Sequence, residues 1–303
     1  MAIFRLNIAE DGGVAAADGG DWRAALTAAI ERAPRAASVA TLIHGFSYTW
    51  RPEEPGFCPH RSIFRAAAPD DGPVCAWPGA LGFDESPETP LCLAVGWDAR
   101  AGGLRGFPAV YRRAEATGRG LAAVAEVAAE AGRPLDCLAH SLGARVALGA
   151  VARAPRGAMR RAILLGPAAD LHEAEAALDA AGGGAQILHV DARANRVFDG
   201  LYHVFAPRRA GARPLGRAAP AHRGWVRLRI DDGATRDALA RRGARLSEAF
   251  PTLSHSCFYA DPGLMAFYAA LLEAPGAPFA GLHAIGKAAD PSGEDVLPAA
   301  SYA

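Results

Sequence analysis

The chain has almost no lysine, no net charge and no long apolar run. Of its 32 basic residues all but Lys287 are arginine, and 32 acidic residues balance them, so the formal net charge is zero at pH 7. A neutral chain offers no basic field to nucleic acid or to an anionic membrane surface. No stretch approaches the ~18 apolar residues that span a bilayer. We therefore expect no nucleic-acid partner and no integral membrane association.

Cysteine is scarce and irregularly spaced. The five cysteines are odd in number and form no CxxC pair, which argues against a disulfide framework and a zinc site. Cys92 and Cys137 stand inside apolar runs and are predicted to be small core residues. Arg5 and Glu10 lie too close together for the apolar region of a signal peptide. These features predict a reduced, cytoplasmic protein.

Sequence motifs for nucleotide cofactors and metals are also missing. No G-x-G-x-x-G follows a predicted strand, and no phosphate-binding G-x-x-x-x-G-K-[ST] loop occurs. No HExxH or Cys/His cluster has metal spacing. The glycine run at 182–184 precedes a strand instead of opening a helix, so it predicts a turn. We expect no cofactor and no metal.

Short apolar runs alternate with alanine-rich segments of helical length, which is typical of an α/β fold with a mainly parallel sheet. We predict a single domain over residues 1–273, with long excursions at 47–89 and 206–224, and a loosely packed tail over 274–303. The predicted strands are 3–8 at a sheet edge, 39–43, 91–97, 135–138, 162–165, 187–190 and 225–230. The predicted helices include one that Asp21 caps, one at about 108–131, one that ends near 153 and a last one at 261–273.

The most informative motif is LDCLAHSLGAR, at residues 135–145. Ser141 stands where a buried strand meets an alanine-rich helix, and the small residues Ala139 and Gly143 lie two positions to either side. This is the pattern of the G-x-S-x-G nucleophile elbow, with alanine in place of the first glycine. The alternative is a serine that only caps the helix. We predict that Ser141 is a nucleophile.

Two further segments supply what a nucleophilic serine requires. In the first, a strand ends at His44-Gly45-Phe46, and the backbone N–H of Phe46, together with that of Leu142, is predicted to bind the oxyanion. The alternative is an ordinary turn at a strand end. In the second, LSHSCFY precedes the last helix, where this architecture delivers its general base. We predict that His255 is that base.

With these three motifs, the chain resembles the alpha/beta-hydrolase superfamily. HGF after a strand, AHSLGARVAL at the elbow and SHSCFY before the last helix carry the likeness, over residues 39–273. Within the superfamily it resembles uncharacterised bacterial alpha/beta hydrolases related to the DUF900 group. The resemblance implies a mostly parallel sheet of about eight strands with helices on both faces, and a Ser/acid/His triad in that chain order. The fold leaves the substrate open.

The acid position departs from the family pattern. The resemblance places an aspartate a few residues after the strand at 186–190, where this chain has Asn195. An N-D-x-x-D pattern in relatives would put Arg196 on the first aspartate and Asp199 on the second. Asp199 lies one helical turn beyond Asn195, and we predict that it orients His255. The alternatives that remain open are Asp170, Asp191 and Asn195.

These residues predict a serine hydrolase that cleaves a carboxylic ester or thioester through an acyl-enzyme, as an esterase, lipase or thioesterase does. Its partner would be a small-molecule or acyl-ester substrate. The alternative is a non-catalytic hydrolase-fold protein for binding or scaffolding, with an incomplete triad. The excursion at 47–89 leaves directly from Phe46 and is predicted to cover Ser141. Its aromatic side chains are Phe57, Phe64, Trp77 and Phe83.

Overall fold

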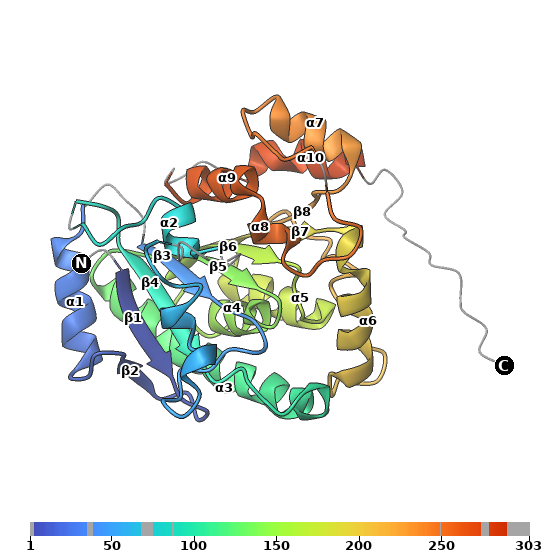
Figure 1. The fold of residues 1–303 in the computed structure, drawn as a ribbon. Coiled ribbons are helices and arrows are strands. Elements are labelled where there is room, and N and C mark those ends of the chain that lie inside the picture. Colours follow the sequence, from blue (N-terminus) through green and yellow to red (C-terminus); the bar gives the residue numbers. More distant parts are fainter. Residues whose placement is uncertain are drawn as a thin grey trace.

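The strands form one sheet in which all but one run parallel. The computed structural model describes residues 3–34, 39–67, 75–86, 88–248, 250–273 and 279–289. Within these ranges eight strands lie in the order β2-β1-β4-β3-β5-β6-β7-β8, and β2 is antiparallel to β1 (Figure 1). They are β1 (Ile3–Ile8), β2 (Val14–Ala16), β3 (Val39–Ile43), β4 (Cys92–Trp97), β5 (Leu135–His140), β6 (Met159–Leu165), β7 (Gln186–Asp191) and β8 (Trp225–Arg229). The predicted α/β class and mostly parallel sheet are confirmed.

Helices cover both faces of this sheet (Figure 1). One face packs against α1 (Trp22–Arg32), α3 (Phe107–Glu130), α4 (Gly143–Val151) and α5 (Leu171–Ala181). The other packs against α2 (Trp77–Ala80), α7 (Gly233–Ala240), α8 (Cys257–Ala260), α9 (Pro262–Glu273) and α10 (Ala280–Ala289). A further helix, α6 (Arg196–Phe205), follows β7, and four short 3₁₀ helices are η1 (Pro55–Phe57), η2 (Pro59–Arg61), η3 (Leu104–Gly106) and η4 (Arg193–Asn195).

The central strands are buried on both faces, which explains their uninterrupted apolar sequences. In β3, Ala40 and Leu42 join the core on the α9 side, whereas Val39 and Ile43 join the core on the α3 side. Cys92 and Cys137 are buried, which confirms their prediction as core residues. Because neighbouring strands are parallel, the carboxyl ends of β3, β4, β5 and β7 meet at one edge of the sheet.

The margins of the fold differ from the prediction in two places. The expected edge strand, β1, lies inside the sheet, because the hairpin strand β2 pairs beyond it. The tail is not loose over residues 279–289, because α10 packs against β8 and α7. Its apolar side chains Phe279, Leu282 and Ile285 are buried in the core. Residues 274–278 and 290–303 lie outside the described part.

The second excursion, 206–224, has no helix or strand, apart from an isolated bridge between Pro214 and Asp170. It is anchored at Leu215, which is buried and whose N–H donates to the carbonyl of Ala169 at 2.9 Å. Only this part of the segment reaches the core beside α5.

The first excursion packs on a face of the sheet, and its role as a cover over Ser141 stays a prediction. Phe64, Trp77 and Phe83 are buried in the same apolar cluster as side chains of β3 and β4, while Phe57 is 42% exposed. These aromatic side chains therefore complete the core beside α9. Trp77 reaches the neighbourhood of Ser141 through its edge-on contact with His140, with ring centroids 6.2 Å apart. Residues 68–74 and 87 lie outside the described part.

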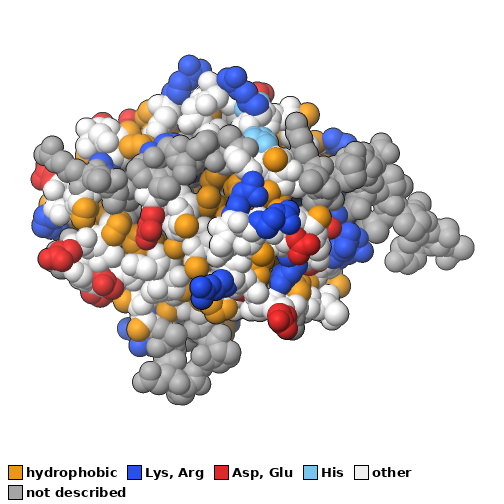
Figure 2. Space-filling model, turned by 90° about the horizontal axis from the view of Figure 1, so that it is seen from above, with side chains coloured by type: hydrophobic (Ala, Val, Ile, Leu, Met, Phe, Trp, Pro, Cys, Tyr) orange, Lys and Arg blue, Asp and Glu red, His pale blue; other side chains and the backbone are white. Residues whose placement is uncertain are grey.

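On the face that carries α7, α9 and α10, apolar, basic and acidic side chains are interspersed (Figure 2). Arg241, Arg242 and Arg245, at and beyond the end of α7, are exposed there. Charge of one sign therefore does not dominate this face. None of the described helices is long and apolar enough to cross a lipid bilayer.

Candidate active site

Ser141 lies on a strained turn at the end of β5. Its φ is +55°, in the left-handed region that non-glycine residues rarely occupy. The turn is held from both sides. The N–H of Ser141 donates to the carbonyl of Leu165 at 2.9 Å, and the carbonyl of Ser141 accepts from Ala144 and Ala168 at 3.0 Å each. Strain that the surrounding structure maintains is often found at functional sites. The backbone thus has the predicted elbow between β5 and α4.

Two glycines allow the end of β3 to pack against this turn. A Cβ on Gly45 would lie 2.7 Å from the Cβ of Ser141, and a Cβ on Gly143 would lie 2.6 Å from the carbonyl oxygen of His44. Both distances are far below van der Waals contact, so only glycine fits at either position. The small residue that the elbow motif requires at 143 is therefore explained by the backbone of the neighbouring strand.

His255 reaches Ser141 from the loop that precedes α8. Its Nε2 lies 2.8 Å from the Oγ of Ser141. The structure thus brings together the predicted nucleophile and the predicted base, which are 114 positions apart in the chain. Each comes from a different element, since Ser141 follows β5 and His255 follows β8 and α7.

Two side chains that the sequence analysis did not single out hold His255 in place. The ring of Phe198 stacks on its imidazole, with centroids 4.5 Å apart and 17° between the planes. The Nε2–H of His140 donates to the backbone carbonyl of His255 at 2.9 Å. His140 precedes Ser141 in the elbow motif, but no pattern in the sequence marks Phe198, which is one of several apolar residues on α6.

Asn195 is the residue that contacts Nδ1 of His255, the ring nitrogen that faces away from Ser141. This corrects the prediction that Asp199 makes that contact. The Oδ1 of Asn195 lies 2.7 Å from the Nδ1 of His255, and the Nδ2 of Asn195 donates to the Oδ1 of Asp199 at 2.8 Å. Asn195 ends η4 and directly precedes α6. Asp199 lies one helical turn farther on, so its carboxylate reaches the amide of Asn195 instead of the imidazole. The helical turn after β7 is confirmed.

The two other aspartates that were considered have different partners. Asp191 pairs with Arg227 at 2.5 Å and with Arg229 at 3.4 Å. Burial alone would raise the pKa of Asp191, but Arg227 and the neighbouring positive charges hold it below its ordinary value. Asp170 precedes α5, and its carboxylate pairs with Arg208 at 3.7 Å. These contacts leave Asn195 as the group that faces Nδ1 of His255.

Burial keeps the imidazole of His255 neutral. Loss of hydration disfavours the charged ring and lowers the pKa of His255 from 6.5 to about 4. The ring of His140 lies 4.5 Å away, and its pKa is also lowered well below 6.5, first by burial and then by His255. Asn195 carries no charge that would raise either value. At neutral pH the imidazole of His255 is therefore uncharged, and with Oδ1 of Asn195 toward Nδ1 the proton lies on Nδ1 and the lone pair on Nε2.

The two predicted oxyanion donors lie beside Ser141. Leu142 follows it at the start of α4, and Phe46 follows Gly45, which packs against Ser141. Within the described part of the chain, the backbone N–H groups of Phe46 and Leu142 donate to no other group. Ser47, at φ +88°, turns the chain away directly after Phe46. The role of these N–H groups as donors stays a prediction.

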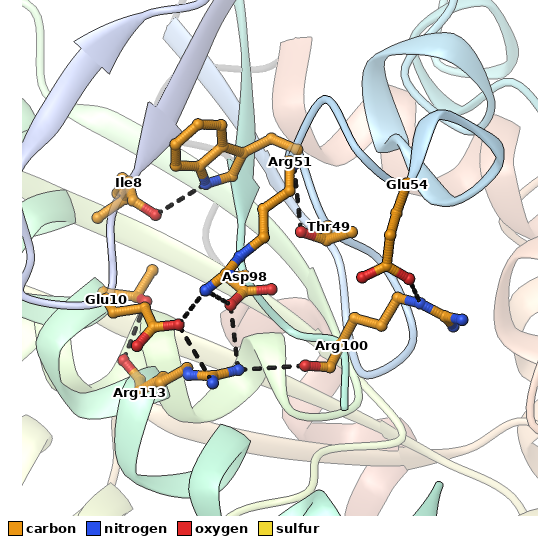
Figure 3. Close-up of polar contacts among 10 residues, drawn as sticks. Ile8, Glu10, Thr49, Arg51, Glu54, Asp98, Arg100 and Arg113 are labelled. Atoms are coloured by element: carbon orange, nitrogen blue, oxygen red, sulfur yellow. Dashed lines mark hydrogen bonds and ion pairs between the residues drawn. The ribbon is translucent and has the colours of Figure 1, made fainter. Parts of the chain in front are cut away.

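A network of four charged side chains fixes the segment that follows Phe46 (Figure 3). Arg51 pairs with Glu10 and, at 2.8 Å, with Asp98, while Arg113 pairs with the same two carboxylates at 3.1 Å each. Asp98 is only 5% exposed, and a carboxylate this buried requires cationic partners. Because Asp98 follows β4 and Arg113 belongs to α3, the network ties this segment to the same sheet edge as Ser141.

The site joins a serine on a left-handed turn, a neutral imidazole and an amide on the far side of that imidazole. Among the described residues, no group of three or more His, Cys, Asp or Glu side chains is arranged to hold a metal ion. Comparisons with family models, with curated proteins and with solved structures found no match for this chain.

Proposed function

We propose that this protein is a serine hydrolase of the alpha/beta-hydrolase type, which cleaves a carboxylic ester or thioester through an acyl-enzyme. The observation that carries the proposal is the chain of hydrogen bonds from Ser141 Oγ to His255 and from His255 to Asn195, at 2.8 and 2.7 Å. A serine on a strained turn, with a neutral imidazole on its hydroxyl, is the arrangement that nucleophilic catalysis requires. A small-molecule or acyl-ester substrate and a cytoplasmic location belong to the same proposal.

The reaction follows from the positions of these groups. Ser141 Oγ attacks the acyl carbon while its proton passes to Nε2 of His255, and the N–H groups of Phe46 and Leu142 bind the oxyanion. His255 then gives the proton to the leaving alcohol or thiol. Water, deprotonated by His255, attacks the acyl-enzyme, which releases the acid and restores Ser141.

The order of the elements supports the hydrolase type. The serine follows β5, the group on Nδ1 follows β7 and the histidine follows β8, which is the Ser, acid, His order of that architecture. Among the described residues, the sheet is also compatible with this type, with eight strands and only β2 antiparallel.

The rival function is a non-catalytic binding or scaffold protein that keeps a hydrolase fold. Asn195 in the acid position favours it, because an amide stabilises the imidazolium less than a carboxylate does. Two features count against it: Oδ1 of Asn195 accepts from Nδ1–H as a carboxylate would, and Cys-His-Asn sites show that an asparagine can serve in a triad. We expect modest turnover.

Probe labelling and ester turnover test the proposal together. The wild-type protein is treated with a fluorophosphonate probe and assayed with p-nitrophenyl acetate and butyrate between pH 6 and 9. We expect labelling and turnover, both lost in Ser141→Ala, with a fall in kcat on the order of 10⁴–10⁶. Ser86→Ala, remote from the site, is the matched control and should keep both signals.

Circular dichroism and thermal melting show whether Ser141→Ala is folded. Retention of turnover within tenfold by the folded Ser141→Ala protein would exclude Ser141 as the nucleophile. A wild-type protein that is neither labelled nor active over this pH range would favour the non-catalytic rival.

A further inference from the structure

The group on Nδ1 of His255 is an amide, and an amide has two different ends. Its oxygen accepts hydrogen bonds, whereas its NH₂ group only donates. With Oδ1 of Asn195 toward His255, Nδ1 carries the proton and Nε2 is free to take the proton of Ser141. With the amide reversed, Nδ1 must be the acceptor, so Nε2 carries the proton and cannot act as a base. Asn195 supports catalysis in one orientation and blocks it in the other.

Asp199 determines which orientation is favoured. Its Oδ1 lies 2.8 Å from the Nδ2 of Asn195. An ionised carboxylate accepts hydrogen bonds and has none to donate, so it selects the NH₂ end of the amide and leaves Oδ1 for His255. Asn195 is 1% exposed, so water has little access to compete for either end of its side chain.

We propose that Asp199 is a positioning residue that acts through Asn195: it holds the amide with its oxygen toward His255 and so fixes the proton on Nδ1. In this arrangement Asn195 contacts the imidazole of His255, and Asp199 contacts Asn195 without touching the imidazole. This inference rests on the proposed hydrolase function and names the residue that regulates its base.

The second excursion holds the carboxylate of Asp199 in place, which is an independent sign that its position matters. A Cβ on Gly216 would lie 2.6 Å from Cγ of Asp199, so the backbone at 216 lies directly against the carboxylate. The side chain of Arg227 in turn donates to the carbonyl of Gly216 at 3.3 Å and pairs with Asp191. The backbone at Gly216 therefore limits the positions open to the Asp199 carboxylate on that side.

The surroundings of Asp199 disfavour the ionised form of its carboxyl group. Burial, and then the charge of Asp191, raise the pKa of Asp199 to about 7, while Arg227, Arg217 and the hydrogen bond from Asn195 act in the opposite direction. Measurements at pH 8 keep most of it ionised, and its effect on the amide is then at its strongest.

A double-mutant cycle separates orientation of the amide from simple structural support. Asp199→Ala is made in the wild type and in Asn195→Asp, and kcat is measured at pH 8 with p-nitrophenyl butyrate. In the wild type we expect kcat to fall at least tenfold, toward the ~10⁴-fold loss that the wrong histidine tautomer causes in a serine protease. In Asn195→Asp the same change should cost nothing or raise kcat, because a carboxylate has two equivalent oxygens. An equal loss in both backgrounds would overturn the proposal.

Two further variants serve as controls. Asp199→Asn offers the amide of Asn195 both an acceptor and a donor, so it should recover only part of the activity that Asp199→Ala loses. Asp231→Ala removes the carboxylate that accepts from the backbone N–H groups of Arg193 and Ala194 in η4, at 2.6 and 3.4 Å. It disturbs the same turn without touching the amide, so the His255 tautomer should stay as in the wild type.

The tautomer itself can be measured without any substrate. Nitrogen-15 spectra of histidine-labelled protein, with His255 assigned from the His255→Gln variant, report which ring nitrogen carries the proton. We expect Nδ1–H in the wild type and in Asp231→Ala, and a shift toward Nε2–H in Asp199→Ala. An unchanged tautomer in folded Asp199→Ala would refute the role of Asp199 even if the protein is an active hydrolase. The expected shift in a protein without esterase activity would uphold it and refute only the proposed function.

Discussion

At the residue scale, the charge of His255 depends on two influences that act in the same direction. Burial lowers its pKa to about 4, and the neutral amide of Asn195 does nothing to reverse this. In the proposed reaction His255 would therefore be able to accept a proton over the whole neutral range, but the imidazolium would have only an amide dipole to stabilise it. The proposal thus implies activity over a wide pH range at a reduced rate.

An exchange of the two residues tests this balance. Asn195→Asp combined with Asp199→Asn keeps the composition and total charge, but it places the carboxylate on Nδ1 of His255. A negative charge there favours the protonated ring, so the pKa of His255 should rise by about one to three units. The acid limb of kcat/KM should then move to higher pH by the same amount, and kcat above that limb should increase.

The measurement is kcat/KM with p-nitrophenyl acetate between pH 4 and 8, in assays short enough for tryptophan fluorescence to confirm the folded state. Asp179→Asn, on α5, removes a carboxylate elsewhere and serves as the control. An acid limb that stays at the wild-type pH in the exchanged protein would show that Asn195 does not govern the charge of His255.

At the scale of elements, the site depends on how closely β3 approaches the turn between β5 and α4. A Cβ on Gly143 would lie 2.6 and 2.8 Å from the backbone oxygens of His44 and Ile43. Backbone atoms cannot rotate away as a side chain can, so Gly143→Ala must push β3 and α4 apart. We expect a loss of about 1–3 kcal/mol in the free energy of unfolding and a marked fall in kcat, because Phe46 moves with β3.

Gly149 provides a matched control in the same helix. A Cβ there would make ordinary contacts, 3.6 Å from Nη1 of Arg153 and 3.7 Å from Cα of Gly118. Gly149→Ala should stabilise α4 by about 0.5–1 kcal/mol and leave kcat unchanged. Urea unfolding and esterase assays of both variants give the comparison, and equal behaviour of the two would refute the steric argument.

The sequence alone predicts the elements whose signal is local. The buried strands and the elbow at Ser141 are continuous patterns of a few residues, and the late loop with His255 follows from the order of elements. The strand β2 is only three residues long, and two of the three are alanine, which does not favour a strand. The alanine and proline residues around α10 leave no clear helical pattern in the sequence. The helix is buried by its contacts with β8 and α7, and these become apparent only in the folded structure.

The family pattern indicates position 195 for the group that contacts His255, but Asn195 carries no charge, so the prediction went to Asp199. Asn195 and Asp199 are separated by one helical turn, and both lie near the end of β7. Which of them meets the imidazole is decided by the angle at which α6 leaves the strand and by the loop of His255, where the N–H of Ser254 donates to the carbonyl of Ala194 at 3.0 Å. Neither feature has a sequence pattern.

At the scale of the whole molecule, buried histidines make stability depend on acid. His44, His140 and His189 are at most 7% exposed, and burial lowers the pKa of His44 and His189 to about 3 and that of His140 well below 6.5. The unfolded chain binds protons at these rings below pH ~6.5, whereas the folded chain does not until far lower pH. Stability is therefore complete above ~6.5 and is lost as pH falls below it, by ~4 kcal/mol per pH unit for the three together.

His189 is the histidine whose removal should extend stability into acid. It lies in the middle of β7, fully buried, and neither of its ring nitrogens has a hydrogen-bond partner within the described part of the chain. The ring packs edge-on against Trp225 at 5.6 Å. His189→Leu keeps an apolar side chain of similar size, removes two unpaired polar atoms and removes one proton-binding group of the unfolded chain. We expect the free energy of unfolding at pH 7 to rise by about 1–3 kcal/mol.

The midpoint of acid unfolding, followed by tryptophan fluorescence, should also move to lower pH in His189→Leu, because fewer protons are taken up on unfolding. His172→Leu, at the start of α5 and partly exposed, is the matched control and should leave the midpoint in place. A midpoint in His189→Leu equal to that of the wild type would mean that this ring is protonated as readily in the folded chain as in the unfolded one. In that case the neutral state of His189 would not be caused by its burial without a hydrogen-bond partner.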